Sequence, residues 1–279
     1  MQIRLLLAII LLTLFFSLTN LSAERTFFPF DNAFQKNTSV EEQVSLLKEL
    51  GYNGICSRPG RATEELFSAL EKYDLKMIAS YVVLPANAEG PLPIWLTEHI
   101  ERLRGSGTII WLSLTGKNAP DKAAVEVIRK VYDLCETNGV ELVLYGHIDF
   151  KTDTAATCAR LRELAERPGI GLSFTLCHEL RQNGQEGLED TIRSIAPHMR
   201  LVQISGANAT PTTTNNWQEY IKPLGQGSFD MSRVIETLDE VGYDGPVNLQ
   251  CYDIAPPAAK HLSESMRAWK QLNQTPEKL

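Results

Sequence analysis

The sequence predicts a single α/β domain in which parallel strands close into a (βα)₈ barrel. Eight apolar, strand-like segments alternate with eight amphipathic, helix-like segments between residues 26 and 272. Their short connections imply right-handed parallel crossovers. An open, doubly wound sheet is the alternative. It is disfavoured because no Gly-x-Gly-x-x-Gly motif follows the first strand, where Asp31-Asn32-Ala33-Phe34 stands instead.

The first 23 residues have the pattern of a secretory signal peptide. Arg4 precedes an apolar run from Leu5 to Leu18, and Ser22-Ala23 offers small residues for cleavage. An uncleaved membrane anchor is the alternative, but the run is short of the ~20 residues that a membrane span needs. We therefore expect an exported protein, periplasmic or secreted, with no stable membrane anchor after cleavage. The domain expected to follow spans residues 24–275, close to the ~250 residues typical of one barrel.

The strands are predicted from short apolar runs rich in β-branched and aromatic residues. In chain order they are Thr26–Phe30, Gly54–Ser57, Lys76–Val83, Thr108–Leu114, Glu141–Tyr145, Gly171–Leu176, Leu201–Ile204 and Val247–Cys251.

The helices are predicted from apolar residues at helical spacing, bounded by capping residues, glycine or proline. In chain order they are Ser39–Leu50, Thr63–Tyr73, Leu92–Leu103, Asp121–Asn138, Thr152–Glu166, Gly187–Ile195, Asp230–Val241 and Ala258–Leu272. The longest irregular stretch, Gly206–Lys222, is a candidate binding loop.

Charge and cysteine content exclude several classes of function. The chain carries a net charge of −7, which argues against a general nucleic-acid binder. Five cysteines without close spacing do not form a disulfide framework or a Cys-x-x-Cys motif. Cys135 and Cys158 are interpreted as apolar helix positions.

The candidate site residues lie at the predicted strand ends, where the active sites of such barrels form. Alternation along each strand places Tyr145, Thr175, Gln203 and Gln250 toward the barrel interior, and Asn248 shares the face of Gln250. Buried amides need hydrogen-bond partners. A ligand or a water network would supply them, although an amide satisfied within the protein is the more frequent case.

Two histidines follow the same strand ends. His178 comes directly after the sixth strand and His147 after the fifth, and both are candidates for proton transfer because imidazole titrates near neutral pH. Cys177 is interpreted as a small buried residue rather than a nucleophile. Trp217 either stacks on a sugar or anchors its loop. We expect His99, His198 and His261 to lie on the surface.

Two motifs carry a family resemblance. The segment Pro223–Asp230 (PLGQGSFD) followed by Leu238–Gly245 (LDEVGYDG), together with Glu49–Gly54 (ELGYNG), resembles the sugar phosphate isomerase/epimerase family. That family belongs to the xylose isomerase-like TIM barrel group, which also includes AP endonuclease IV-type enzymes. The resemblance extends from about Phe27 to Trp269 and implies the same barrel.

The resemblance also implies where a divalent metal would be held in the family: by Glu, Asp, His and Glu on the last four strands. By motif position, Tyr145, Thr175, Gln203 and Gln250 stand at these places, whereas His147 and His178 match the accessory histidines. Hard divalent cations prefer carboxylate oxygens. We therefore expect no metal ligand set and no cofactor, with a divalent metal at a different site left open as an alternative.

The function expected from this combination is an isomerase-like or epimerase-like protein acting on a sugar or polyol. His147 and His178 would transfer protons, and Tyr145 would orient or polarise a carbonyl. The substrate's hydroxyl groups would contact Gln203, Gln250 and Asn248, and Thr175 and Trp217 would complete the substrate-binding site. A catalytically inactive carbohydrate-binding barrel is the alternative, and a metal-dependent nuclease or hydrolase is disfavoured. The oligomeric state is left open.

Overall fold

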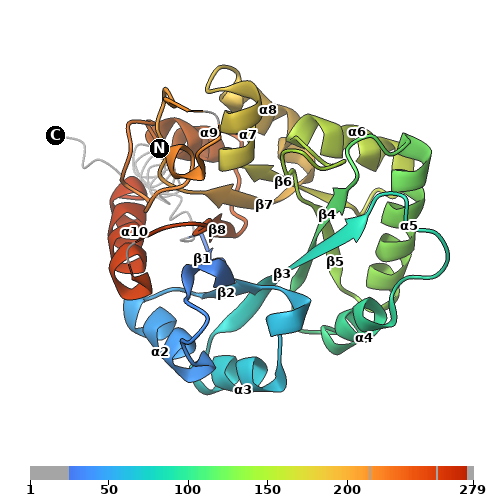
Figure 1. Cartoon of the computed structure of the whole chain (residues 1–279), viewed down its shortest axis with the longest axis horizontal. Helices are drawn as coiled ribbons and strands as arrows, with labels where there is room; N and C mark the ends of the chain where they lie inside the picture. Colours follow the sequence, from blue (N-terminus) through green and yellow to red (C-terminus); the bar gives the residue numbers. More distant parts are fainter. Residues whose placement is uncertain (1–24, 214, 256, 275–279) are drawn as a thin grey trace, which may run out of the picture.

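In the computed structural model, which describes residues 25–213, 215–255 and 257–274, eight parallel strands form a closed barrel surrounded by helices (Figure 1). The expected signal peptide lies outside these residues. The sheet order is β1-β8-β7-β6-β5-β4-β3-β2, and a parallel bridge between Phe30 and Cys56 closes the ring from β1 to β2. The strands are β1 (Phe27–Pro29), β2 (Gly54–Ser57), β3 (Lys76–Pro85), β4 (Ile109–Thr115), β5 (Glu141–Leu144), β6 (Gly171–Thr175), β7 (Met199–Ile204) and β8 (Val247–Leu249).

All eight predicted helices are present, within a few residues of their expected ends. They are α2 (Val40–Leu50), α3 (Glu64–Lys72), α4 (Ile94–Arg102), α5 (Asp121–Thr137), α6 (Ala155–Ala165), α8 (Leu188–Ile195), α9 (Ser232–Glu240) and α10 (Ala258–Leu272). A further helix, α7 (Leu176–Asn183), was not expected. The alternating pattern of β6 continues into Leu176. The sequence therefore does not show where the strand ends and the helix begins.

Helix ends follow from ordinary capping chemistry. Ser39 and Glu42 form a reciprocal capping box at the start of α2, which satisfies two backbone donors. The same helix ends at Gly51, whose φ of +86° is a left-handed conformation that glycine adopts without steric cost.

The core has two parts. An outer apolar layer fills the space between strands and helices, and a smaller inner cluster fills the barrel itself. Trp111 and Tyr145 meet edge to face in this inner cluster, with ring centroids 4.4 Å apart, beside Val143 and Leu201. These side chains fill the lower barrel, so any ligand is confined to its mouth.

Two of the three histidines expected at the surface are buried, which corrects that prediction. The Nε2 of His99 lies 2.8 Å from the hydroxyl oxygen of Ser80, and the Nε2 of His261 lies 3.3 Å from the carbonyl oxygen of Ala33. Both lie on helix faces that pack on the barrel, where helical periodicity places them once the apolar stripe is fixed. His198 is partly exposed, in the short 3₁₀ helix η3 (Ala196–His198). No helix in the described ranges is long and apolar enough to cross a membrane.

Candidate active site

A cavity of about 280 Å³ opens at the carboxyl ends of the strands. Five of the residues predicted from the sequence to form the site lie in its wall: Tyr145, His147, His178, Trp217 and Gln250. We call this cavity the mouth pocket. Its other lining residues are Phe30, Asn32, Arg58, Tyr81, Ile221 and Tyr252.

The three remaining candidates do not line the mouth pocket. The hydroxyl of Thr175 is buried and donates to the carbonyl oxygen of Gly146 at 2.7 Å. Gln203 and Asn248 are also fully buried, one layer below the pocket floor. Because neither amide lines the cavity, their expected role in contacting hydroxyl groups of a ligand does not follow from this geometry.

The two buried amides begin a chain of hydrogen bonds with a defined direction. The Nδ2 of Asn248 donates to the carbonyl oxygen of Phe28 at 3.1 Å, which leaves its Oδ1 to accept. The Nε2 of Gln203 donates to that Oδ1 at 2.9 Å. Because a backbone carbonyl only accepts, it fixes the orientation of both amides, and the oxygen of Gln203 faces the barrel centre.

Gln250 fixes the same orientation independently. Its Oε1 accepts the backbone N–H groups of Cys251 and Tyr252 at 3.0 and 3.1 Å. Its Nε2 therefore donates, and it points to the Oε1 of Gln203 at 3.3 Å. Two separate backbone anchors thus agree on where the Gln203 oxygen lies.

The chain continues through Tyr145 to His178. The hydroxyl of Tyr145 donates to the Gln203 oxygen at 2.9 Å and lies 3.0 Å from the Nε2 of His178. A phenol has one hydrogen, which goes to Gln203, so His178 donates its Nε2–H to the phenol oxygen. This leaves Nδ1 as the atom with the lone pair, and this buried atom has no hydrogen-bond partner among the described residues. We call the path from the Phe28 carbonyl through Asn248, Gln203 and Tyr145 to His178 the neutral relay.

The second histidine has the opposite tautomer. The Nδ1 of His147 lies 2.8 Å from the carbonyl oxygen of Ile148 and must donate to it, so its Nε2 carries the lone pair. The two imidazole rings lie side by side in the pocket wall, with centroids 4.2 Å apart.

Both imidazoles are neutral near pH 7. Burial holds the pKa of His178 well below its usual range, and the nearby His147 and Arg181 lower it further. Burial also lowers the pKa of His147, although its bond to the Ile148 carbonyl and the charge of Asp149 oppose this effect. Desolvation penalises the charged form of a base, so both rings are available as proton acceptors.

Cys177 is buried below the pocket, and its sulfur lies 4.0 Å from the Gln203 oxygen. Burial raises the pKa of its thiol to about 12. The thiolate is therefore disfavoured, in agreement with its interpretation as a small apolar residue.

Six of the lining residues were not predicted from the sequence, and two of them, Asn32 and Arg58, place polar groups at strand ends. Asn32 follows β1 and donates its Nδ2 to the Oε1 of Gln250 at 2.8 Å, while its own Oδ1 is buried without a partner. Arg58 follows β2, and its guanidinium lies 5.6 Å from the Phe30 ring centre. For the last four strands, polar residues at the strand ends were expected to face the mouth. The same expectation, applied to the first two strands, would have identified Asn32 and Arg58.

Trp217 lies edge-on to His178, with centroids 5.3 Å apart. The guanidinium of Arg181 covers its ring at 4.2 Å from the centroid. Trp217 thus forms part of the pocket wall and packs against Arg181 of α7.

The residues at the four family metal positions do not fit a divalent cation. The Gln203 oxygen already accepts from Tyr145 and Gln250, and the Thr175 hydroxyl is bound to a backbone carbonyl. Within the part of the chain that the structure describes, no group of three or more His, Cys, Asp or Glu side chains is arranged to hold a metal ion.

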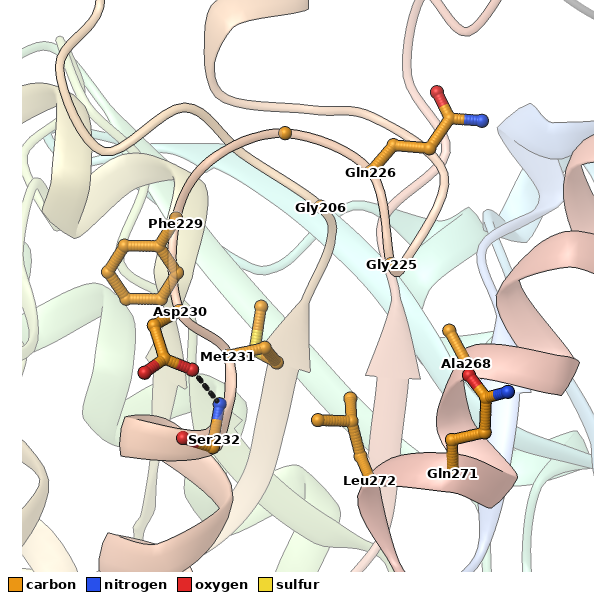
Figure 2. A pocket seen from close by; sticks show the side chains of 11 residues that line it. Gly206, Gly225, Gln226, Phe229, Asp230, Met231, Ser232, Ala268, Gln271 and Leu272 are labelled. Atoms are coloured by element: carbon orange, nitrogen blue, oxygen red, sulfur yellow. Dashed lines mark hydrogen bonds between the residues drawn. The ribbon is translucent and has the colours of Figure 1, made fainter.

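The glycine-rich turn that carries the family resemblance lies in a different cavity (Figure 2). A Cβ on Gly227 would lie 2.0 Å from the Ala207 carbonyl oxygen, and one on Gly225 would lie 2.7 Å from the Ala268 side chain. Asp230 accepts the backbone N–H of Ser232 at 3.0 Å at the start of α9. These glycines therefore allow a close approach of backbone segments, and the motif serves the fold rather than the mouth pocket.

Residues 44–272 match the family model described as xylose isomerase-like TIM barrel. The chain belongs to this family. No curated protein sequence matches this one.

Solved structures of similar fold include sugar epimerases and a dehydratase. The 3-keto-D-glucoside 4-epimerase YcjR of E. coli is 14% identical, with a TM-score of 0.70 over 88% of this chain and 99% of its own. The D-allulose 3-epimerase of a Methylomonas species is 13% identical, with a TM-score of 0.69 over 90% and 99%. The probable 3-DHS dehydratase AsbF of Bacillus anthracis is 15% identical, with a TM-score of 0.73 over 88% and 98%. At these identities the similarity establishes the fold alone.

Proposed function

We propose that this protein is a sugar or polyol isomerase that moves a proton next to a carbonyl group, using His147 and His178 as its acid–base pair. The observation that carries the proposal is the pair of neutral imidazoles in one pocket wall, each with a free lone pair and a backbone-anchored tautomer. Positioned general bases of this kind contribute about 10²–10⁴-fold to a rate.

The polarity of the pocket floor supports a polyhydroxylated ligand. The Nδ1 of His178 and the Oδ1 of Asn32 are both acceptors without partners among the described residues. Unpaired acceptors are satisfied by donors, and the hydroxyl groups of a sugar supply several. Aromatic rings from Tyr81, Trp217 and Tyr252 line the same cavity and suit the apolar face of a sugar ring.

The positions of the two bases favour isomerisation over two-base epimerisation. His147 and His178 follow neighbouring strands, β5 and β6, so they approach a substrate from the same side. A base on that side can take the proton from one carbon and return it to the adjacent carbon, while the second imidazole shifts the hydroxyl proton to the former carbonyl oxygen. Inversion of one carbon by two bases requires one base on each face.

Tyr145 has a positioning role in this scheme. The hydrogen of its hydroxyl is committed to Gln203, so polarisation of a substrate carbonyl by Tyr145 would require breaking the neutral relay. Its phenol oxygen instead holds the Nε2–H of His178 and thereby keeps Nδ1 as the basic atom.

Export and metal independence belong to the same proposal. The composition of residues 1–23 supports action outside the cytoplasm, in the periplasm or the medium, on a small-molecule sugar or polyol. Two members of the neutral relay, Tyr145 and Gln203, stand at positions where the family resemblance places metal ligands, and both are engaged in hydrogen bonds. This supports a reaction that does not pass through a metal.

Proton exchange with solvent provides the test. The full chain would be incubated in D₂O with a panel of aldose–ketose pairs, with EDTA in one series and with Mn²⁺ or Mg²⁺ in another. NMR would then follow deuterium next to the carbonyl. We expect incorporation with EDTA present, a loss of at least tenfold in His147→Ala and His178→Ala, and no change in His198→Ala, a histidine outside the pocket.

The second candidate function is a catalytically inactive carbohydrate-binding barrel. It is favoured by the fact that Gln203, Asn248 and Tyr145 satisfy one another and leave few groups free for chemistry. Sugar binding without deuterium incorporation in either series would select this function over the isomerase.

A further inference from the structure

We propose that the mouth pocket binds a sugar acid, with Arg58 holding a carboxylate at the end of the substrate remote from the reacting carbon. This inference rests on the proposed function for placing the reacting carbon of the substrate at His147 and His178. The placement of the carboxylate at Arg58 rests on separate observations.

The first observation is the charge of the pocket wall. Arg58 lines the cavity, and none of the other ten lining residues is Asp or Glu. Its guanidinium makes no ion pair or hydrogen bond with the described residues, in a chain that has 34 acidic and 27 basic residues. A second guanidinium, that of Arg181, stacks on Trp217 at the same mouth.

The carboxylate beside Arg58, that of Asp31, binds other groups through one of its oxygens. Asp31 is buried, and its Oδ2 accepts the hydroxyl of Ser57 at 3.1 Å and the backbone N–H of Arg58 at 3.2 Å. Its ion-pair partner is Arg61, at 3.7 Å. Asp31 thus holds the backbone of the β2 loop while the Arg58 side chain faces the cavity.

The second observation is the place of Arg58 in the barrel. In the closed ring, β2 lies four strands from β6 in either direction, so Arg58 and His178 stand on opposite sides of the mouth. A ligand that touches both must extend across the pocket. The acidic group is therefore at the far end of the carbon chain from the carbonyl, as in a hexuronate.

A carboxylate fits this subsite better than a phosphate ester does. One planar guanidinium offers paired N–H donors that match either a carboxylate or a phosphate, so the rest of the subsite decides between them. Phosphate subsites usually add a glycine-rich loop or a helix N-terminus. The Gly225–Gly227 turn belongs to the separate cavity in Figure 2.

Calorimetric binding to the full chain would test the subsite with three probes that share one carbon skeleton: D-glucuronate, D-glucose and D-glucose 6-phosphate. We expect glucuronate to bind at least tenfold more tightly than glucose and than the phosphate ester. In Arg58→Gln the ratio of glucuronate to glucose affinity should fall at least tenfold, and Arg58→Lys should restore only part of it. Arg129→Gln removes a surface ion pair with Glu166 and serves as the matched control.

The outcomes separate this inference from the proposed function. Equal affinity for glucuronate and glucose, or a ratio that Arg58→Gln leaves unchanged, overturns the carboxylate subsite even if proton exchange is observed. Tighter binding of the phosphate ester also overturns it. A glucuronate preference that depends on Arg58, without deuterium incorporation, supports the subsite and rejects the isomerase.

Discussion

The side-chain amide of Asn248 donates to the backbone carbonyl of Phe28, and this bond helps to determine which nitrogen of His178 is basic, three residues further along the neutral relay. The carbonyl belongs to β1 and the imidazole to α7, so strand pairing between β1 and β8 sets the chemistry on the other side of the barrel. The predictions below follow from this relay and from the burial of the histidines.

Tyr145→Phe removes the acceptor that holds the Nε2–H of His178. We expect turnover to fall at least tenfold, about 1.4 kcal/mol in the barrier, because the imidazole loses its fixed tautomer. The buried donor left behind should also lower stability by about 1–3 kcal/mol. Long-range ¹⁵N–¹H NMR spectra of His178 would report the tautomer directly. Tyr132→Phe, whose hydroxyl bonds Glu136, is the control. A retained tautomer in Tyr145→Phe would contradict the relay.

The pH profile of kcat/KM should be flat on its acid side down to about pH 6.5, the ordinary pKa of histidine. The neutral imidazole is the active form, and burial lowers the pKa of both His147 and His178. Activity is therefore present above the lowered pKa values and is lost as the pH falls through them. An acid limb centred above pH 7 in the free enzyme would rule out these histidines as the bases.

His99 should make folding stability depend on pH. Burial lowers its pKa to about 4, so between pH 6.5 and 4 the unfolded chain binds a proton that the folded chain does not. Stability is complete above pH 6.5 and declines as the pH falls. Between pH 7.5 and pH 5 the free energy of unfolding should fall by about 2 kcal/mol more in the wild-type protein than in the His99→Gln variant. The glutamine keeps a partner for Ser80 but does not titrate. Urea unfolding at both pH values measures this difference, and equal losses in the two proteins would disprove it.

Purified protein should retain no stoichiometric Zn²⁺ or Mn²⁺ after dialysis. The oxygens at the family's metal positions are already engaged by Tyr145, Gln250 and backbone groups. Elemental analysis provides the measurement. One tightly held metal per chain, lost in His147→Ala or His178→Ala, would reveal a different site built on these histidines.

The mature chain should begin near Glu24. Small residues at Ser22 and Ala23 precede this position after an apolar segment of signal-peptide length. Amino-terminal sequencing of the native protein tests the cleavage, and recovery of an intact Met1 chain from a membrane fraction would show an uncleaved anchor instead.

The sequence was sufficient to predict the barrel because its periodicity is local. Strand β2 and helix α10 have the predicted bounds, and the other elements differ by a few residues. The site was predicted less completely. Tyr145, His147, His178 and Gln250 do converge at the mouth, but the depth of each side chain depends on barrel tilt and register, which no local pattern gives. For this reason Gln203, Asn248 and Thr175 were expected to contact ligand and lie instead beneath the pocket.

Helix α7 is a second feature that could not be predicted from the sequence. Its first residues extend the apolar run of β6, and only the three-dimensional structure shows that His178 is carried by a helix. The helix orients the imidazole back over the barrel, within reach of Tyr145.

The neutral relay also bears on how such a protein can change over time. Each member satisfies the next, so Gln203→His alone would leave the Oδ1 of Asn248 and the hydroxyl of Tyr145 without their partners, at a cost of about 1–3 kcal/mol. Gln250→Glu alone would place a carboxylate oxygen against the Oε1 of Gln203, which now accepts from the Nε2 of Gln250. Introducing a metal-ligand set at these positions would therefore require several substitutions together, because each side chain now bonds its neighbours. The side chains of this site are therefore interdependent, and a single substitution at one of them is opposed by the hydrogen bonds that its neighbours lose.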